Sequence, residues 1–422
     1  MFERVKKNIL IGNWALGTYL LYGGFLMFFL FQTVHDRSDA ELDLRMNHRF
    51  ERVIKVWIDH GFFKHAGLWF GHSVDEKPDQ NIHWTITTGF LFGPYLLERL
   101  HIALTGEFSR RLLTYYNQLI PMLSSALLGF LAMRMVIPLG VSLLSAFLLG
   151  IGVQTAYQTL PLNLGLFWEL IVTHAIPFML VFLIIEEHIL NNKDTPRLRF
   201  FRGLAVFCMF FSDFQTSLLF IPFYLVIKAT TIPKFDLKSD LKIMAIPAVF
   251  LSILWAAQLI WIKINHPGVK FIGSTINSRT GFDGVTHYYN THWELFNSKW
   301  HYVFPSWNTM WVLGGLALVA IVIFVQKTKK LISHQTIVLA GLGLYIPMAF
   351  IFSQSGVIHP YLYEPYLAIP FYLAFFSLLP AWLENFFNHS KLFVFFAILI
   401  AFSCSGIQLF GYFLHVPPYF YL

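Results

Sequence analysis

Three aspartates follow the first apolar segment of the chain, and their position suggests acid–base chemistry. Asp36, Asp39 and Asp43 belong to residues 33–63, the most charged stretch of a chain whose residues are 56% hydrophobic. Because the preceding run is long enough to cross a membrane, these acids stand at the membrane boundary, within reach of a lipid phosphate headgroup. A carboxylate there can accept the proton of an incoming hydroxyl group as a general base. The competing interpretation is a solvated, charged face on a surface helix.

A surface helix is predicted directly after the first of these acids. Residues 38–41 have the S-x-x-E form of a capping box, which predicts a helix that begins at Asp39. The helix is expected to end near Gly61, since glycine suits a left-handed C-terminal cap. Its apolar residues recur at spacings of three and four and are Leu42, Met46, Phe50, Val53 and Trp57. The pattern predicts an amphipathic helix that lies on the membrane surface.

Ionisable side chains interrupt two later apolar runs. Glu169 and His174 share one run, and Asp213 lies in the polar break 212–217 of another. Such a placement is costly unless the side chain faces a cavity or a partner. Glu169 and His174 are therefore candidates for substrate binding, with a structural Glu–His pair as the alternative. The polar residues around Asp213 can equally serve to satisfy backbone groups.

A second group of candidate binding residues lies in residues 266–307, which combine tyrosines and tryptophans with a few cations. Arg279 can contact phosphate through two hydrogen bonds, and His287 is next to two tyrosines. Tryptophan and tyrosine also gather at any membrane interface, which is the alternative. The 17 histidines show no pair at a metal-binding helical spacing, so no metal site is predicted.

The composition places the chain among integral membrane proteins. Only 13% of the 422 residues are charged, whereas 18% are aromatic, far outside the range of soluble globular proteins. Residues 1–422 are expected to form one polytopic domain. The run 9–31 is too long for a signal peptide and is predicted to be a retained helix. The net charge of +7 reflects basic loops next to membrane helices and gives no indication of nucleic-acid binding.

Basic residues predict the orientation. Arg4, Lys6 and Lys7 precede the first apolar run, so the positive-inside rule places the N-terminus in the cytoplasm. Three later basic clusters are each expected in the cytoplasm, and they are Lys193, Arg197, Arg199 and Arg202, then Lys228, Lys234, Lys238 and Lys242, then Lys327, Lys329 and Lys330. Apolar runs between these clusters predict about eleven crossings, with the C-terminus outside. They lie near 9–32, 114–133, 137–155, 167–186, a pair inside 203–227, 244–264, 307–326, 336–353, 366–382 and 392–414. The predicted fold is an all-α polytopic membrane protein whose large extracytoplasmic loops are 33–110, with juxtamembrane helices, and 265–306.

Two segments do not fit simple crossings. Residues 203–227 have basic residues at both ends and are short for two spans, so two short helices that meet at the polar break are expected. Residues 84–104 are apolar enough to cross but contain Glu98, Arg99 and His101. We expect this segment to be a helix that lies at the outer interface or dips into it.

The order of these segments resembles the GT-C glycosyltransferases, and most closely the branch of protein mannosyltransferases and aminoarabinose transferases. The first loop has an early acid, a juxtamembrane helix that ends in "WIDHGFF", and the hydrophobic stretch "TITTGFLFGPYLLERLHIAL". "TGEFSRRLLTYYNQLIPMLSSALLGFLAMRM" then resembles the helix that ends in arginines, and 203–227 resembles the paired short helices. "IHPYLYEPYLAIPF" is similar to the late outer loop, which contains His359, Tyr361 and Tyr363.

The resemblance implies an inverting membrane enzyme that moves a sugar from a polyprenyl-phosphate carrier to a lipid, glycolipid or glycan acceptor. The reaction would take place at the outer face of a bacterial inner membrane and would need no cofactor. Asp39 or Asp36 would be the general base, while Arg279 and His359 would hold the carrier phosphate. Some features depart from the family pattern. The usual Asp-Glu pair is replaced by H-D-R-S-D-A-E, and residues 156–168 contain no second acid, so Glu169 is the nearest candidate.

Three other interpretations remain at this stage. A transporter or flippase of lipid-linked saccharide would use the intramembrane Glu169, His174 and Asp213 as a path. A polymerase or ligase acting on a diphosphate carrier would have its large loop late in the chain, whereas the largest loop here follows the first helix. A non-catalytic membrane scaffold would retain the fold without the chemistry.

Overall fold

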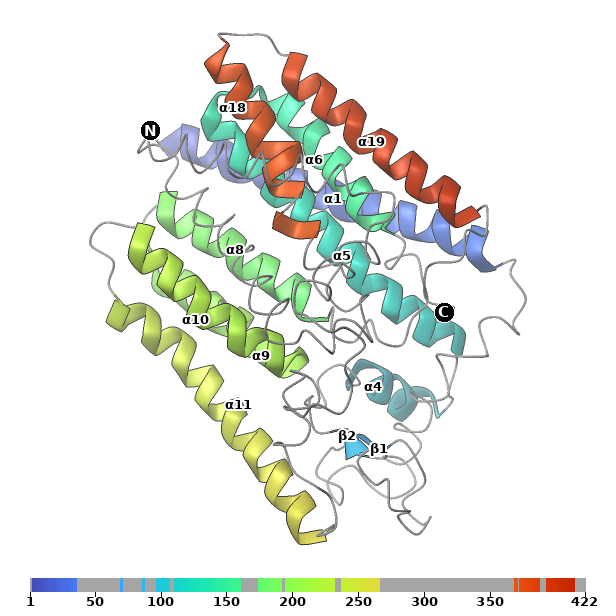
Figure 1. The fold of residues 1–422 in the computed structure, drawn as a ribbon, viewed down its shortest axis with the longest axis vertical. Coiled ribbons are helices and arrows are strands. Elements are labelled where there is room, and N and C mark those ends of the chain that lie inside the picture. Colours follow the sequence, from blue (N-terminus) through green and yellow to red (C-terminus); the bar gives the residue numbers. More distant parts are fainter. Residues whose placement is uncertain are drawn as a thin grey trace, which may run out of the picture.

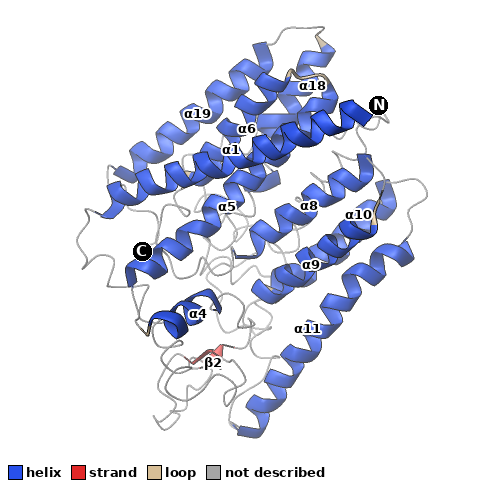
Figure 2. Cartoon of the chain, turned by 180° about the vertical axis from the view of Figure 1, so that it is seen from behind, coloured by secondary structure: helices blue, strands red, loops and turns tan. Residues whose placement is uncertain are grey.

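The computed structural model is a bundle of helices. It describes residues 2–35, 69–70, 86–87, 96–106, 110–160, 174–191, 194–231, 237–265, 368–370, 372–387 and 392–413. Nearly all of these residues are helical, apart from one antiparallel pair of two-residue strands. The long helices run side by side with a common tilt when seen from the front (Figure 1) and from behind (Figure 2). The described residues thus have the predicted all-α architecture.

Three helices form one side of the bundle. They are α1 (Phe2–His35), α5 (Arg110–Val136) and α6 (Leu143–Gln158). Tyr19 of α1 stacks on Phe147 of α6 with ring centroids 5.2 Å apart, and further along both helices Gln158 donates a 2.9 Å hydrogen bond to the carbonyl of Gly23. α1 therefore runs parallel to α6. Ser142, whose side chain accepts a hydrogen bond from the Ser145 amide, caps the start of α6.

Glycines allow α5 and α6 to approach closely. A Cβ atom added at Gly129 would lie 2.6 Å from the carbonyl oxygen of Gly150, and one added at Gly150 would lie 2.6 Å from that of Gly129. Tyr19 also lies against Gly150, and its hydroxyl donates a 3.0 Å hydrogen bond to the Phe147 carbonyl. Helices in lipid gain little from hydrophobic burial against one another, so small residues at such crossings are a principal source of packing energy.

The C-terminal helices cover α6. They are a π-helical turn (Leu373–Leu378), α18 (Leu379–Phe386) and α19 (Leu392–Phe413). Thr159, just after α6, hydrogen-bonds through its hydroxyl to the side-chain oxygen of Gln408 on α19 at 2.7 Å, and Ala401 packs on Gly152. These contacts make α19 parallel to α6.

Four consecutive antiparallel helices form the other side of the bundle. They are α8 (Ile176–Asn191), α9 (Pro196–Ser212), α10 (Phe214–Thr231) and α11 (Leu237–Asn265). Pro196 in the first turn and Thr195 as the cap fix the start of α9. Phe182 of α8 contacts Tyr224 of α10, with ring centroids 4.9 Å apart, and Gly203 of α9 packs against Ile243 of α11.

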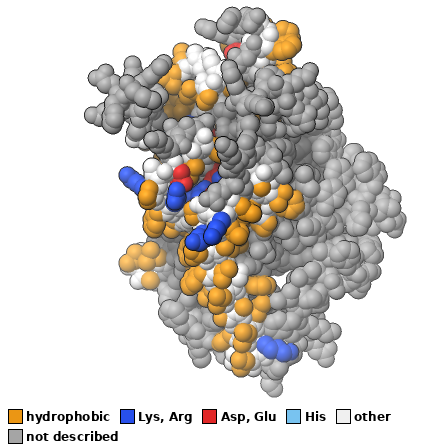
Figure 3. Space-filling view, turned by 90° about the vertical axis from the view of Figure 1, so that its left-hand side faces the viewer, with side chains coloured by type: hydrophobic (Ala, Val, Ile, Leu, Met, Phe, Trp, Pro, Cys, Tyr) orange, Lys and Arg blue, Asp and Glu red, His pale blue; other side chains and the backbone are white. Residues whose placement is uncertain are grey.

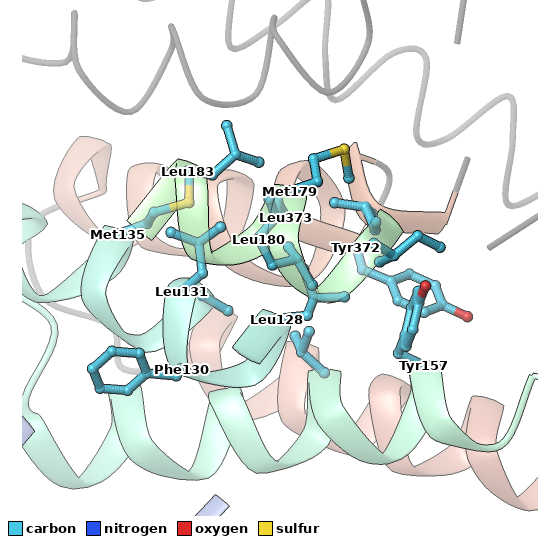
Figure 4. Packing of buried hydrophobic residues seen from close by; sticks show 14 of the residues in the cluster. Leu128, Phe130, Leu131, Met135, Tyr157, Met179, Leu180, Leu183, Tyr372 and Leu373 are labelled. Atoms are coloured by element: carbon cyan, nitrogen blue, oxygen red, sulfur yellow. The ribbon is translucent and has the colours of Figure 1, made fainter. Parts of the chain in front are cut away.

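The two sides share a buried core, shown in Figure 4. Leu128, Leu131 and Met135 project from α5 toward Met179, Leu180 and Leu183 of α8, and Leu373 and Tyr372 close one end of the cluster. All of these side chains are buried. Close packing of this kind is what holds helices together where water does not drive their association.

Part of the first large loop is also described. Strand β1 (Trp69–Phe70) pairs with β2 (Ile86–Thr87), and α4 spans Leu96–Thr105 and ends at Gly106 with a φ of 73°. The apolar stretch 84–104 is therefore not one continuous helix. Within it, the β-branched residues Ile86 and Thr87 form a strand, and the helix that the structure describes begins at Leu96, two residues after Pro94. Ten residues of helix span only about 15 Å, half of a hydrocarbon core.

Four helices are long and apolar enough to cross a membrane within the described residues, at Asn13–Leu30, Gln118–Leu139, Leu237–Asn265 and Leu392–Leu409. Shorter apolar helices such as α6 pack between them. These findings support membrane association. The eleven crossings inferred from the sequence stay a prediction, because several of those segments lie outside the described residues.

Candidate functional site

His174 is the sequence-predicted site residue that lies within the described ranges. The other candidates lie outside them and are Asp36, Asp39, Asp43, Glu169, Arg279, His287, His359, Tyr361 and Tyr363. His174 stands two residues before α8 and is only 7% exposed. Its Nε2 atom has no hydrogen-bond partner in the part of the chain that the structure describes. A buried ring nitrogen without a partner is uncommon and leaves a polar group available for binding.

Asp213 separates α9 from α10. Its backbone is extended, with φ −143° and ψ 93°, between helices that end at Ser212 and begin at Phe214. The Asp213 amide donates to the Met209 carbonyl at 2.9 Å, and the Ser217 amide donates to the Asp213 carbonyl at 3.1 Å. The predicted break between two helices is thereby confirmed, whereas the helices themselves, of 17 and 18 residues, are longer than the two short helices expected inside 203–227. Both Asp213 and Ser217 are buried.

The register of the helices places His174 and Asp213 at the same end of the bundle. Glu186 of α8 binds Arg202 of the antiparallel α9 through an Nη1–Oε1 contact of 2.6 Å. His174 precedes Glu186 by twelve residues, and Asp213 follows Arg202 by eleven. At 1.5 Å per residue both lie about 17 Å from the ion pair. His174 and Asp213 therefore lie at similar heights, at the ends of neighbouring helices.

Uncharged polar side chains form a seam between α1, α5 and α6. Gln158 accepts a 3.1 Å hydrogen bond from the Ser125 hydroxyl and donates to the Gly23 carbonyl. The side-chain amide of Gln154 donates to the Tyr19 carbonyl at 2.7 Å. The seam is buried, and its bonds connect helices that are far apart in the sequence. Sequence reasoning missed these residues, because single polar residues in apolar runs do not reveal their partners.

A cluster of four charged side chains lies at the opposite end from Asp213. Glu186 contacts Arg202 and also Lys228, whose Nζ lies 2.6 Å from Oε2 of Glu186. Asp240 is bound by Lys228 and by Arg202, the latter at 3.0 Å. The Tyr224 hydroxyl donates to Glu186. We call Glu186, Arg202, Lys228 and Asp240, together with Tyr224, the ion cluster.

The ion cluster corrects the interpretation of two basic residues. The sequence placed Arg202 and Lys228 in basic clusters flanking membrane helices, but Arg202 is 1% exposed and Lys228 5% exposed. Their partner Glu186 was not recognised as a candidate, although an acid in the apolar run of α8 is the same signal that selected Glu169. The cluster contains two acids and two bases, so its charges balance. It ties α8, α9, α10 and α11 together.

These two polar regions differ in what they can do. The ion cluster is closed, because each of its carboxylates is already bound by two cations. The end that carries His174 and Asp213 has a buried nitrogen that can still accept or donate a hydrogen bond. Among the described residues there is no group of three His, Cys, Asp or Glu side chains that could hold a metal ion. We therefore take the His174 end as the candidate functional site.

No family model, curated protein or solved structure matches this chain significantly. The resemblance to the GT-C enzymes thus depends on the order and character of the segments in the sequence.

Proposed function

We propose that the protein is a GT-C-like membrane glycosyltransferase, which transfers a sugar from a polyprenyl-phosphate carrier to a lipid, glycolipid or glycan acceptor. One observation carries the proposal. The segments that contain the candidate site residues all continue from helix ends at the same end of the bundle.

Two of the segments adjoin α1 and α8. α1 runs parallel to α6, because Tyr19 and Gly23 contact Phe147 and Gln158 in that order. Its last residue, His35, therefore lies beyond the polar seam and away from the ion cluster, and the acids 36–43 follow it directly. α5 is antiparallel to α6, and Arg134 near the end of α5 binds Glu187 near the end of α8. α6 therefore ends, and α8 begins, at this same end, and Glu169 belongs to residues 161–173 between them.

The other two segments adjoin α11 and the C-terminal helices. α11 runs parallel to α9, since Asp240 contacts Arg202 and Phe250 contacts Phe207, with ring centroids 6.3 Å apart. Asn265 is therefore at the end opposite to the ion cluster, where the segment with Arg279 begins. Residues 359–367 precede Tyr372, whose hydroxyl contacts the carbonyl of Ala156 near the end of α6.

The proposed mechanism is a single displacement at the anomeric carbon. Asp39 or Asp36 accepts the proton of the acceptor hydroxyl while its oxygen forms the new glycosidic bond. The bond from the sugar to the carrier phosphate breaks, and Arg279 and His359 stabilise the phosphate that leaves. One displacement inverts the configuration. Tyr361 and Tyr363 contribute to donor binding, and Asp43, Glu169, His174 and His287 to the binding of sugar, acceptor or headgroup.

The proposed location is a bacterial inner membrane, with the N-terminus cytoplasmic and the site outside. Buried and exposed basic residues gather at the ion-cluster end, in agreement with a cytoplasmic position under the positive-inside rule. The segments 36–43 and 266–307 then lie on the outer face, where lipid-linked sugars are used after they are flipped across the membrane.

The decisive experiment measures transfer of a labelled sugar from a synthetic polyprenyl phosphate by purified protein. Asp39→Asn and Asp36→Asn are tested separately, and one of them is expected to lose activity by about 100-fold or more, because a general base contributes on that order. Asp194→Asn, in an exposed ion pair at the other end, is the matched control and should retain activity. Full activity in both Asp36 and Asp39 variants would remove the proposed base.

A transporter of lipid-linked saccharide is the alternative. The assay separates the two functions, since a transporter moves the labelled lipid across a vesicle membrane without cleaving the sugar–phosphate bond. The closed, charge-balanced ion cluster does not favour the alternative, because its carboxylates are already bound and offer no vacant site along a path.

A further inference from the structure

We propose that the surface beside the ion cluster is a binding site for one anionic glycerophospholipid, whose phosphate is held by Arg197, Lys238 and Lys242. We call these three residues the basic triad. The inference is independent of the proposed enzymatic function. It follows from which charges are paired at this end of the bundle and which are not.

Every acid that the structure describes at this end of α8, α9, α10 and α11 already has a cation. Glu186 and Asp240 are bound inside the ion cluster, and Glu187 is bound by Arg134 at 2.7 Å. The fourth, Asp194, pairs with Arg199 at 2.7 Å. No carboxylate among the residues described at this end of the helices is left to neutralise further cations.

The basic triad consists of the exposed cations that remain at this end in the described parts of α9 and α11. Arg197, Lys238 and Lys242 are exposed and form no ion pair with any residue the structure describes. Lys238 and Lys242 are one turn apart on α11 and so share a face. Gly203 of α9 packs against Ile243 of the parallel helix α11, and Arg197 lies six residues before Gly203 while Lys238 lies five before Ile243, so the two cations are at similar heights.

An apolar surface follows the basic triad along α9 and α11, in the direction of the C-terminal ends of both helices. Phe200 and Leu204 on α9 and Ile246, Val249 and Ile253 on α11 are all exposed. In Figure 3, several Lys and Arg side chains lie at the upper end of a strip of hydrophobic side chains, and a further basic side chain lies at its lower end. This is the arrangement that a lipid requires, with a phosphate at the charges and acyl chains along the apolar side chains.

The length of α11 fits this assignment. Residues 243–262 contain no Asp, Glu, Lys or Arg, and Lys242 and Lys263 bound this stretch. Twenty helical residues span about 30 Å, which equals the thickness of the hydrocarbon core. Lys238 and Lys242 therefore lie at the level of the phosphates, and Lys263 marks the other surface. A soluble phosphate would gain nothing from the apolar surface, so the charge pattern and the surface together favour a lipid.

Native mass spectrometry of the full-length protein in detergent tests the proposal. We expect retention of phosphatidylglycerol in clear preference to phosphatidylcholine. The triple variant replaces each cation of the basic triad with glutamine (Arg197→Gln, Lys238→Gln, Lys242→Gln). Each lost charge should weaken binding of phosphatidylglycerol roughly fivefold, so the affinity of the triple variant should fall about 100-fold. Lys263→Gln is the matched control on the same helix and should lose little.

Two further measurements keep the test specific. Lys238→Arg with Lys242→Arg retains the charges and should retain the preference for the anionic lipid, and raised salt should weaken it. Equal binding of phosphatidylcholine, an unchanged affinity in a correctly folded triple variant, or an equal loss in Lys263→Gln would overturn the proposal. Competition by glycerol 3-phosphate at the same concentration as the lipid would also overturn it, since that result would indicate a soluble ligand.

Discussion

Removal of Glu186 is the sharpest test of how the bundle is held together. Glu186→Gln keeps the size of the side chain but leaves Arg202 and Lys228 facing Asp240 alone, so one positive charge is buried without compensation. Loss of one partner from a buried ion pair costs about 3–5 kcal/mol. We expect a loss of stability of that size, measured by reversible unfolding of the detergent-solubilised protein in SDS.

A second substitution tests the cause of that loss. Glu186→Gln combined with Lys228→Met restores the charge balance, since Arg202 and Asp240 remain as a pair. The double variant should therefore be more stable than the sum of the two single variants predicts, by about 1–3 kcal/mol. Arg199→Gln breaks an exposed pair and should cost less than about 1 kcal/mol. Strictly additive losses, or equal losses in Glu186→Gln and Arg199→Gln, would refute the reasoning.

Two further predictions concern the packing of α1, α5 and α6. Gly150→Ala places a methyl group against the Tyr19 hydroxyl and should destabilise the protein by about 1–3 kcal/mol, whereas Gly17→Ala, which meets no atom within 4 Å, should be neutral or slightly stabilising. A thermal shift assay compares the two, and equal midpoints would contradict the packing argument. Gln158→Leu removes the hydrogen bond to the Gly23 carbonyl and should cost about 1–3 kcal/mol in the same assay; an unchanged midpoint would show that the seam contributes nothing.

The sequence predicted local breaks better than tertiary partners. The polar residues around Asp213 were sufficient to predict where α9 ends and α10 begins, because backbone groups at a break need polar neighbours in an apolar setting. In contrast, hydropathy alone suggested one apolar helix over 84–104. It did not reveal that residues 86–87 pair with β1, because strand pairing depends on a partner distant in the chain.

The candidate site could be predicted only in part. His174 was selected because an ionisable side chain in an apolar run is costly unless it has a partner or faces a cavity. In the structure it is buried at the same end of the bundle as Asp213. The ion cluster was not predicted. Basic residues near a helix end give the same sequence pattern whether their side chains are solvated in the loop or buried in the bundle. Arg202 is buried because it binds Glu186, which lies sixteen residues away in the sequence. The acids of the first loop stay predictions until transfer is measured.

The ion cluster also bears on how the chain enters the bilayer. α8 carries Glu186, α9 carries Arg202, α10 carries Lys228 and α11 carries Asp240. As the helices are synthesised in this order, the summed charge of these side chains is −1 after α8, 0 after α9, +1 after α10 and 0 after α11. Neutrality is first reached with the α8–α9 hairpin and again with the α10–α11 hairpin. Insertion of these segments as hairpins, rather than singly, would keep the translocon from releasing an unpaired charge into lipid.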